Sequence, residues 1–449
     1  MRIHRHGIAA GSAGSILSLG SLLSFGSMAA VVNATVLAAM AILPAAVVVI
    51  ATAHAGEVAV IDGVPHVRNG AVPDGGVRTL ELEELWRRGG WDDEEVMFGA
   101  VRRAVVDESD TIYLLDSQLS EVKVLSPEGE LVAVLGREGE GPGEFRNATD
   151  LCLLPDGTVA VTQMFPGRIV RLARDGTPAG TITVGDPAQG AFYMARALRR
   201  GGENVVLGGA EQHVDQAAGR ATRESFIATF DTSGQRKVTY ASRLSVIDHR
   251  NLSYDEVILG EGPDRRFAVG PRGEVVTAEA RNGYEVRVYA PGGELRRVFT
   301  RDYRPWLRNE QARDIQRRIL TTLRDRQAPH ASIHFEDTEP DIASLRVDEH
   351  GRIWVQTSRA LWEPAPGVFT RYDVFTPDGR FAEQVLVRCE GDPRQDGLLF
   401  ARSDLVFRIT GYRDAMLSGF GGAGGEDDGV EPEPMQVICY RVRDRAAAG

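Results

Sequence analysis

The chain has 449 residues, of which 43% are hydrophobic and 25% are charged. This balance excludes a disordered chain and a polytopic membrane protein. The formal net charge is −12 and no basic run occurs, which excludes nucleic-acid binding because the surface repels phosphate backbones.

Residues 1–55 have the features of an export segment. Two arginines open the chain, and no further charged residue occurs before Glu57. An apolar run from Met28 to Ala53 ends at Ala53-His54-Ala55, the small-x-small pattern that signal peptidase cleaves. The run is also long enough to span a bilayer, so a cleaved signal peptide and a retained membrane anchor both stay open. In either case, we expect the remainder to be periplasmic, extracellular or anchored outside the cytoplasm, with this segment as its only membrane contact.

A pattern of four short strands repeats along the rest of the chain. The first copy has two strands within Val105–Leu115, then Glu121–Leu125 and Leu131–Leu135, and the second has Asp150–Leu154, Thr158–Thr162, Arg168–Leu172 and Thr181–Val184. Ile112 of the first copy aligns with Val159 of the second, a period of 47 residues. Four diverged copies begin near Glu203, Phe267, Ser344 and Leu398. The strands alternate apolar and polar residues between Asp, Pro and Gly turns, which is typical of hairpins.

Four-stranded units that repeat every 40–50 residues indicate a β-propeller, because one such sheet cannot bury both of its faces alone. We therefore predict an all-β fold, a six-bladed β-propeller of four-stranded antiparallel blades over residues 78–445. The sixth copy lacks its outermost strand, whereas Thr79–Gly89 reads as the end of a repeat. We expect this N-terminal strand to complete the last blade and close the ring. Residues 56–77 are a linker or an extra strand.

The segment Gly136–Phe145 has the pattern G-x-x-G-x-G-P-G-E-F. Together with Leu114–Gln118, Glu121–Val124 and Tyr372–Phe375 before Pro377-Asp378-Gly379, it makes residues 80–445 resemble the NHL-type six-bladed propellers. The similarity is closer to uncharacterised exported bacterial six-bladed propellers. This resemblance implies a ligand-binding or protein-interaction module, or an enzyme such as a lactonase, a strictosidine-synthase-like protein or an amidating lyase. The fold does not select among them.

Three insertions are expected on the same face as Gly136–Phe145, namely residues 241–265, residues 302–338 and Thr357–Pro366. Within the second, Asn309–Arg326 has apolar residues at helical spacing and predicts a helix that is either a lid or a structural plug. Residues 418–434 are Gly-rich and then acidic, which predicts a flexible loop. Long ordered loops are where binding sites tend to lie.

The residues themselves predict no catalytic group and no metal site. Three cysteines allow at most one disulfide, and whether Cys389 and Cys439 pair stays open. Histidine pairs at metal-binding spacing and a GxSxG motif are both missing from the repeat region. In lactonase-like propellers, Ca²⁺ lies in the channel. The residues here that could take this role are Asn147, Asp150, Asn204 and Asn282.

We therefore predict a monomeric, non-catalytic extracytoplasmic binding scaffold whose loop-rich rim binds an envelope protein, a peptide or a glycan. The alternative is a Ca²⁺-dependent hydrolase of lactonase type, or a lyase-like enzyme, with its site in the propeller channel. Arginine and aromatic side chains concentrate binding energy at interfaces. By loop position, the expected contact residues are Arg146, Gln163, His213, Arg281, Tyr284, Arg359, Trp362 and Arg413.

Overall fold

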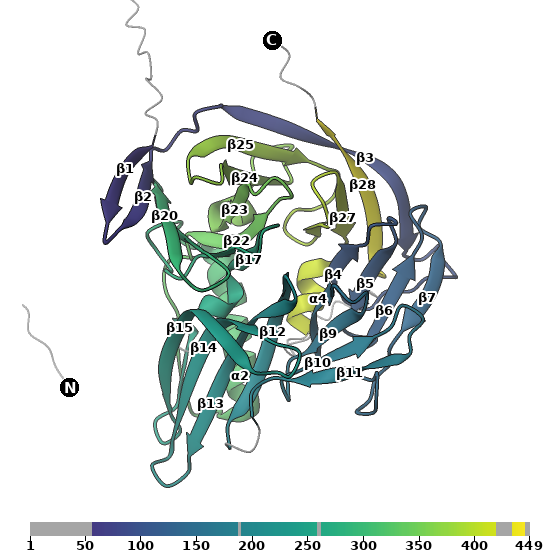
Figure 1. The fold of residues 1–449 in the computed structure, drawn as a ribbon, viewed down its shortest axis with the longest axis horizontal. Helices are drawn as coiled ribbons and strands as arrows, with labels where there is room; N and C mark the ends of the chain where they lie inside the picture. Colours follow the sequence, from purple (N-terminus) through teal and green to yellow (C-terminus); the bar gives the residue numbers. More distant parts are fainter. Residues whose placement is uncertain (1–55, 187–189, 258–261, 419–432, 445–449) are drawn as a thin grey trace, which may run out of the picture. The chain divides into compact units, whose positions relative to one another are not determined.

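The computed structural model describes residues 56–186, 190–257, 262–418 and 433–444 (Figure 1). The described residues all belong to one compact unit of the chain, residues 52–449. The predicted export segment lies outside the described residues, as does most of the predicted acidic loop. In the described part, no helix is both long and apolar enough to cross a membrane.

Three antiparallel sheets of four consecutive strands follow one another along the chain. The first has β4 (Val101–Val106), β5 (Ile112–Asp116), β6 (Glu121–Leu125) and β7 (Leu131–Leu135). The second has β8 (Ala148–Leu153), β9 (Val159–Gln163), β10 (Arg168–Leu172) and β11 (Pro178–Thr183). The third has β12 (Phe192–Gly201), β13 (Asn204–Asp215), β14 (Arg220–Phe230) and β15 (Arg236–Asp248).

The later strands build two larger sheets. A six-stranded sheet contains β17 (Phe267–Val269), β18 (Val275–Thr277), β19 (Glu285–Tyr289) and β20 (Leu295–Arg301), extended by the hairpin β1 (Glu57–Ile61) and β2 (Val64–Asn69). An eight-stranded sheet joins β22 (Ile342–Val347), β23 (Ile353–Thr357), β24 (Thr370–Phe375) and β25 (Phe381–Arg388) to β26 (Gly397–Phe400), β27 (Leu405–Ile409), β28 (Gln436–Asp444) and β3 (Val77–Gly89).

The hairpins turn where the sequence placed Asp and Gly. In the turn between β9 and β8, the Asp156 carboxylate accepts a hydrogen bond from the Thr158 amide at 3.0 Å, and Gly157 has φ = 82°. Asp231 accepts bonds from the amides of Ser233 and Gln235 at 2.9 and 3.0 Å. An aspartate that binds the backbone two residues ahead, followed by a residue in the left-handed region, fixes a tight turn.

The sheets are buried on both faces. In β5, Ile112 and Leu114 pack toward β27 and β28, whereas Tyr113 and Leu115 pack toward β8 and β9. Because successive side chains of a strand point to opposite faces, an almost wholly apolar strand serves two cores at once. The same alternation occurs at Val205 to Leu207 in β13.

Each four-stranded unit packs against the unit before it and the unit after it. In chain order the units are β4–β7, β8–β11, β12–β15, β17–β20, β22–β25, and the unit of β26–β28 with β3. One hydrophobic cluster lies between each unit and the next, and a sixth lies between the last unit and the first. Figure 1 shows these units arranged around a common centre. This arrangement is a β-propeller.

The N-terminal strand closes the ring, as the sequence predicted. β3 pairs antiparallel with β28 from Leu80 opposite Asp444 to Gly89 opposite Gln436, and its first residues pair parallel with β25. Leu80 is only 2% exposed in the core between β24, β25 and β3. This pairing joins strands from the two ends of the propeller and covers the edge of β28 that faces away from β27.

Several details differ from the predictions. The strands β13, β14 and β15 are 11 to 13 residues long, so the first part of the expected insertion at residues 241–265 continues a strand. For residues 56–77, the structure has extra strands, which was one of the two alternatives, since β1 and β2 form a hairpin and β2 pairs parallel with β20. All three cysteines are free, so Cys389 and Cys439 do not form a disulfide.

The predicted helix is α2, Glu310–Gln327. The Asn309 side chain caps it by accepting a hydrogen bond from the Ala312 amide at 2.9 Å. Ala312 and Leu320 on its apolar stripe are buried. The helix contacts the short strands β16 (Ser253–Asp255) and β21 (Ser332–His334), which belong to two different insertions.

Ring closure by β3 predicts unequal effects of one substitution at two positions of this strand. Leu80→Ala should lower the free energy of unfolding by about 2–5 kcal/mol, because it opens a cavity in a closed core. Leu85→Ala, at a position 37% exposed, should change it by less than about 1 kcal/mol. Denaturant unfolding of both variants, followed by tryptophan fluorescence, measures the difference. Equal effects would contradict the closure.

Candidate functional site

The connections between sheets and the hairpin between the second and third strands of each sheet lie at one end of the strands. We call this end the loop face. It carries the glycine run at residues 136–145, the insertions at residues 249–266 and 302–341, and two short helices, α3 (Ser358–Trp362) and α4 (Tyr412–Ser418). α3 lies within the loop that was expected at Thr357–Pro366. The Thr357 hydroxyl caps the start of this helix by accepting a hydrogen bond from the Ala360 amide.

The glycine run is a compact turn structure. Gly136 and Gly143 have φ values of 75° and 78°. A Cβ on Gly136 would lie 2.4 Å from the ring of Phe145, which is fully buried. Glu144 accepts hydrogen bonds from the Gly141 amide at 2.9 Å and from Arg137 at 2.7 Å. The run therefore folds over Phe145 and seals the core beneath it.

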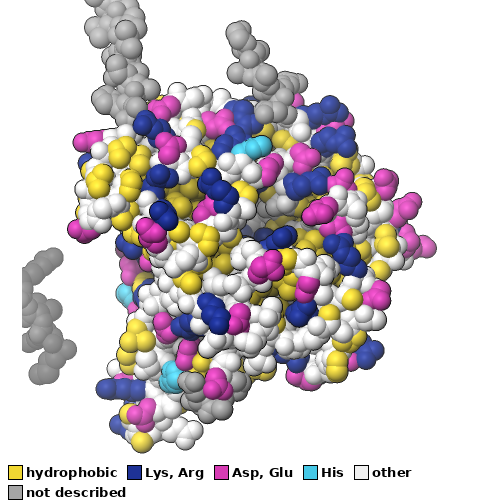
Figure 2. Space-filling model, viewed as in Figure 1, with side chains coloured by type: hydrophobic (Ala, Val, Ile, Leu, Met, Phe, Trp, Pro, Cys, Tyr) yellow, Lys and Arg dark blue, Asp and Glu magenta, His cyan; other side chains and the backbone are white. Residues whose placement is uncertain are grey.

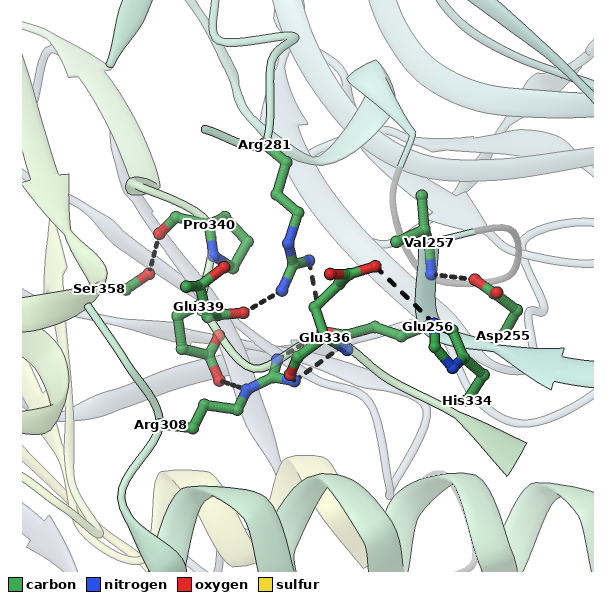
Figure 3. Close-up of polar contacts among 11 residues, drawn as sticks. Asp255, Glu256, Val257, Arg281, Arg308, His334, Glu336, Glu339, Pro340 and Ser358 are labelled. Carbon is green, nitrogen blue, oxygen red and sulfur yellow. Dashed lines mark hydrogen bonds and ion pairs between the residues drawn. The ribbon is translucent and has the colours of Figure 1, made fainter. Parts of the chain in front are cut away.

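Two insertions are joined by a buried ion pair (Figure 3). β16 and β21 pair in parallel, and directly after β16 the carboxylate of Glu256 accepts two hydrogen bonds from Arg308, at 2.8 and 2.5 Å. The Arg308 side chain is 1% exposed and that of Glu256 is 8% exposed. A bidentate pair in this environment is strong because it is shielded from water.

Further contacts satisfy the remaining groups of this pair. Arg308 also donates to Glu339 at 2.7 Å and to the Glu336 carbonyl at 2.8 Å, while Glu256 accepts from the Glu336 amide at 3.1 Å. Arg281 lies 3.5 Å from Glu256. Burial acts to raise the pKa of Glu256, but the hydrogen bonds and charge of Arg308, with the charge of Arg281, outweigh it and hold the pKa below its usual value. We call these five residues the Arg308 network, and it fixes the insertions as one structure.

An aromatic stack lies beside this network. The indole of Trp306 stacks on that of Trp362, with ring centroids 5.7 Å apart and an angle of 10° between the planes. The guanidinium of Arg413, from α4, lies 4.6 Å from the centre of the Trp362 ring. Burial lowers the pKa of Arg413. The stack therefore joins the second insertion, α3 and α4, which come from three parts of the chain.

A groove of about 640 Å³ opens next to the stack. Its lining includes Tyr303 and Trp306 together with Arg301, Arg304, Arg359 and Arg371. Asp373 accepts two hydrogen bonds from Arg301, at 2.9 and 2.6 Å, and Glu363 pairs with Arg359 at 3.2 Å. The lining residue Asp302 lies 3.8 Å from Arg68, outside the groove. No described residue forms a hydrogen bond or ion pair with the side chain of Arg304 or Arg371, so this loop-face groove carries two uncompensated positive charges.

The structure brings together three of the contact residues expected from the sequence, Arg359, Trp362 and Arg413, at the stack and groove. Arg281 belongs to the neighbouring Arg308 network, where its guanidinium also donates to the Thr338 carbonyl. Arg146 is half-exposed and pairs with Glu138 at 3.4 Å. His213 lies on β13 rather than in a loop, with its ring 2.8 Å from Glu211.

Gln163 and Tyr284 correct the expectation that every residue in these loops faces a partner. Both are buried, with 0% and 1% exposure. The Gln163 side chain accepts from the Arg146 amide and from Arg168, each at 3.0 Å. The Tyr284 hydroxyl donates to Asp373 at 2.7 Å, and burial raises the pKa of Tyr284 well above its usual value. Both side chains support the loops from within, because a side chain bonded inside the protein does not reach a ligand.

The residues that could mimic a calcium site do not fit one. Asn147 and Asn282 are exposed on the loop face, whereas Asn204 starts β13 at the opposite end. The fourth, Asp150, is buried between Arg103, at 3.4 Å, and Arg199, with which it also pairs. Two guanidinium groups repel a divalent cation. Across residues 56–444 as described, no group of three or more His, Cys, Asp or Glu could hold a metal ion.

Sequence reasoning found Arg359 and Arg281 but missed the groove residues Arg304 and Arg371 and the Arg308–Glu256 pair, since whether an arginine has a partner depends on residues distant in the chain. Pairs of consecutive arginines were the available signal for the channel. Arg102-Arg103, Arg199-Arg200 and Arg265-Arg266 each lie in or directly before an innermost strand. Arg265 is exposed, yet burial lowers its pKa to about 10.

No protein-family model matches the chain, and no curated protein matches it. Solved structures similar to it include a Bacteroides fragilis protein (10% identity, TM-score 0.45, covering 82% of this chain and 100% of that one). Virginiamycin B lyase from Staphylococcus aureus is 8% identical, with a TM-score of 0.39 and coverage of 80% and 99%. The calcium-binding protein regucalcin from Agrobacterium tumefaciens is 10% identical, with a TM-score of 0.38 and coverage of 82% and 97%. At these identities and TM-scores, the assignment of the fold rests on the strand pairing and cores described above.

The Arg308 network predicts a large effect of a small change. Glu256→Gln should lower the free energy of unfolding by about 1.5–3 kcal/mol, because it removes one of the two carboxylates that bind the buried Arg308, the one that accepts both bonds of the bidentate pair. Asp337→Asn is the control, since it removes an exposed partner of Arg313 and should cost no more than about 1 kcal/mol. Denaturant unfolding gives both values, and hydrogen exchange should show the loss concentrated in α2. Similar values for the two variants would contradict a structural role of the buried pair.

The same network predicts sensitivity to acid. Because the pKa of Glu256 is lower in the folded protein than in the unfolded chain, its contribution to stability is complete above the usual glutamate pKa. The contribution disappears as the pH falls through the lowered pKa. The protection factors of the α2 amides, which are corrected for the pH dependence of the intrinsic exchange rate, should therefore fall on acidification in the wild-type protein, and Glu256→Gln should lose this fall. Protection of α2 that is independent of pH in the wild type would overturn the prediction.

Proposed function

We propose that the protein is an exported six-bladed β-propeller of the NHL type that binds an acidic partner on its loop face without catalysing a reaction. The number of blades is supported by the cores, each of which lies between two consecutive four-stranded units. The NHL type is supported by Gly136–Phe145. Export is supported by the apolar run and small-x-small pattern before Gly56.

The single observation that carries the binding function is the pair of uncompensated guanidinium groups, Arg304 and Arg371, in a groove with aromatic walls. The remaining charged groups of the lining already have partners, as described above. A guanidinium that is kept without a counter-ion in a protein of net charge −12 is available to a carboxylate of a ligand. Tyr303 is half-buried and offers apolar surface beside it, whereas Trp306 is 2% exposed and supports the groove from behind.

The proposed partner is an envelope protein, a peptide or a glycan that presents carboxylate groups. Arginine and tryptophan side chains carry a large share of the binding energy at known interfaces. Arg359, Trp362 and Arg413 belong to the proposed surface, because they form one side of the groove or the stack behind it. Arg146, His213 and Arg281 are candidates farther along the loop face.

Binding through this groove predicts the effect of removing the two free arginines. The full-length protein is tested against arrays of glycans with and without uronic acids, and of acidic and neutral peptides. We expect binding only to carboxylate-bearing probes, with a Kd that rises with salt. Arg304→Ala together with Arg371→Ala should weaken this binding at least about tenfold.

The control is Arg272→Ala together with Arg296→Ala, which removes two exposed arginines beside the turns at the other end of the strands. This pair should leave the Kd unchanged. Failure of all acidic probes to bind, or an equal loss in both double variants, would overturn the proposed function.

A further inference from the structure

A second arginine-lined pocket lies at the end of the propeller opposite the loop face. Its volume is about 580 Å³, and it is formed where the innermost strands β4, β8, β12 and β26 end. Its lining contains five arginines, Arg103, Arg174, Arg199, Arg200 and Arg402. We call it the channel mouth. On the face drawn in Figure 2, dark blue Arg and Lys side chains lie beside yellow side chains around a recessed centre.

Two of the five arginines already have counter-charges. Arg174 pairs with Asp107 and donates to the Tyr113 hydroxyl at 2.9 Å. Arg402 pairs with Asp110, and with Asp404 at 3.1 Å. The other lining carboxylate, Glu108, is exposed in the turn after β4, and no described residue forms an ion pair with it. The charges of the other three arginines, Arg103, Arg199 and Arg200, are not compensated by these pairs.

Arg103 and Arg199 share one carboxylate, that of Asp150. Its two oxygens also accept hydrogen bonds from the amides of Leu151 and Leu198, each at 2.9 Å. The Nε atom of Arg103 is buried, and no described group forms a hydrogen bond with it. The positive charge of Arg199, and then burial, lower the pKa of Arg103. One carboxylate therefore does not compensate the two guanidinium groups, which repel each other.

Arg200 adds a third guanidinium. Its side chain is exposed, and no described residue forms a hydrogen bond or ion pair with it. All three arginines line the same pocket, together with Cys152. Burial raises the pKa of the Cys152 thiol to about 12, so it stays neutral and supplies no negative charge.

We propose that the channel mouth binds a small molecule through an oxyanion group, held by Arg103, Arg199 and Arg200. Planar guanidinium groups bind the oxygens of phosphate, sulfate and carboxylate in pairs of parallel hydrogen bonds, and an anion there relieves the repulsion between the arginines. The pocket is larger than an inorganic ion, which leaves room for an organic group. This site is separate from the loop-face groove and does not depend on its function.

The experiment is isothermal titration of the full-length protein with inorganic phosphate, sulfate and citrate in turn, at low ionic strength. We expect saturable binding at one site by at least one of these anions, and the order of their affinities identifies the oxyanion. Arg200→Gln should raise the Kd of the anion that binds most tightly at least about tenfold. Arg200→Lys keeps the charge but loses the planar fork, so its Kd should fall between those of the wild type and Arg200→Gln.

Arg318→Gln is the matched control. Arg318 is likewise exposed and without a bonded partner among the described residues, but it lies on α2 at the loop face. This variant should bind the anion as the wild type does. Because Arg200 is exposed, its substitution should leave the thermal unfolding unchanged, which a melting curve verifies. Absence of saturable binding by all three anions, or equal Kd values for Arg200→Gln and Arg318→Gln, would overturn the proposal.

Discussion

Burial of both faces of each sheet is the constraint on which the rest of this structure depends. A four-stranded antiparallel sheet usually has one face in water, but here β5 places Ile112 and Leu114 in one core and Tyr113 and Leu115 in the next. A unit of this kind gains its stability only from its two neighbours. The series of units must therefore close on itself, and β3 achieves this by pairing with β28 near the end of the described chain.

Because the side chains within the strands pack in the hydrophobic cores, the charged groups that could bind a ligand lie in the connections and at the strand ends. The two long insertions of the loop face are not loose additions. Their strands β16 and β21 pair, and the buried Arg308 and Glu256 join them with every strong hydrogen-bonding group satisfied. Breaking such a pair is expensive, whereas a complete one specifies a single arrangement of the chain. The insertions thus give the neighbouring groove a rigid wall, which lowers the entropic cost of binding.

Arginines without a full counter-charge line two pockets in a protein that is negative overall. Arg304 and Arg371 face the loop-face groove, and Arg103, Arg199 and Arg200 line the channel mouth. In both, some arginines are paired with aspartate or glutamate, while Arg304 and Arg371 in the groove and Arg200 at the channel mouth have no partner among the described residues. Surface acidity repels anions at a distance, so selectivity at these sites must come from short-range, geometrically defined hydrogen bonds. The two sites lie at opposite ends of the strands and are separable by mutation.

The sequence by itself determined the all-β class, the repeating strands, the closing role of Thr79–Gly89 and the helix after Asn309, because turn chemistry, alternation and helix capping are local properties. It predicted the loop face but could not tell that Gln163 and Tyr284 turn inward, nor that Trp306 stacks on Trp362. Only the tertiary structure decided which arginines have partners. Arg301 and Asp373 are 72 residues apart in the chain. Contacts between residues this far apart in the chain decide whether a guanidinium is neutralised or free for a ligand. The periodicity of the sequence does not predict such contacts.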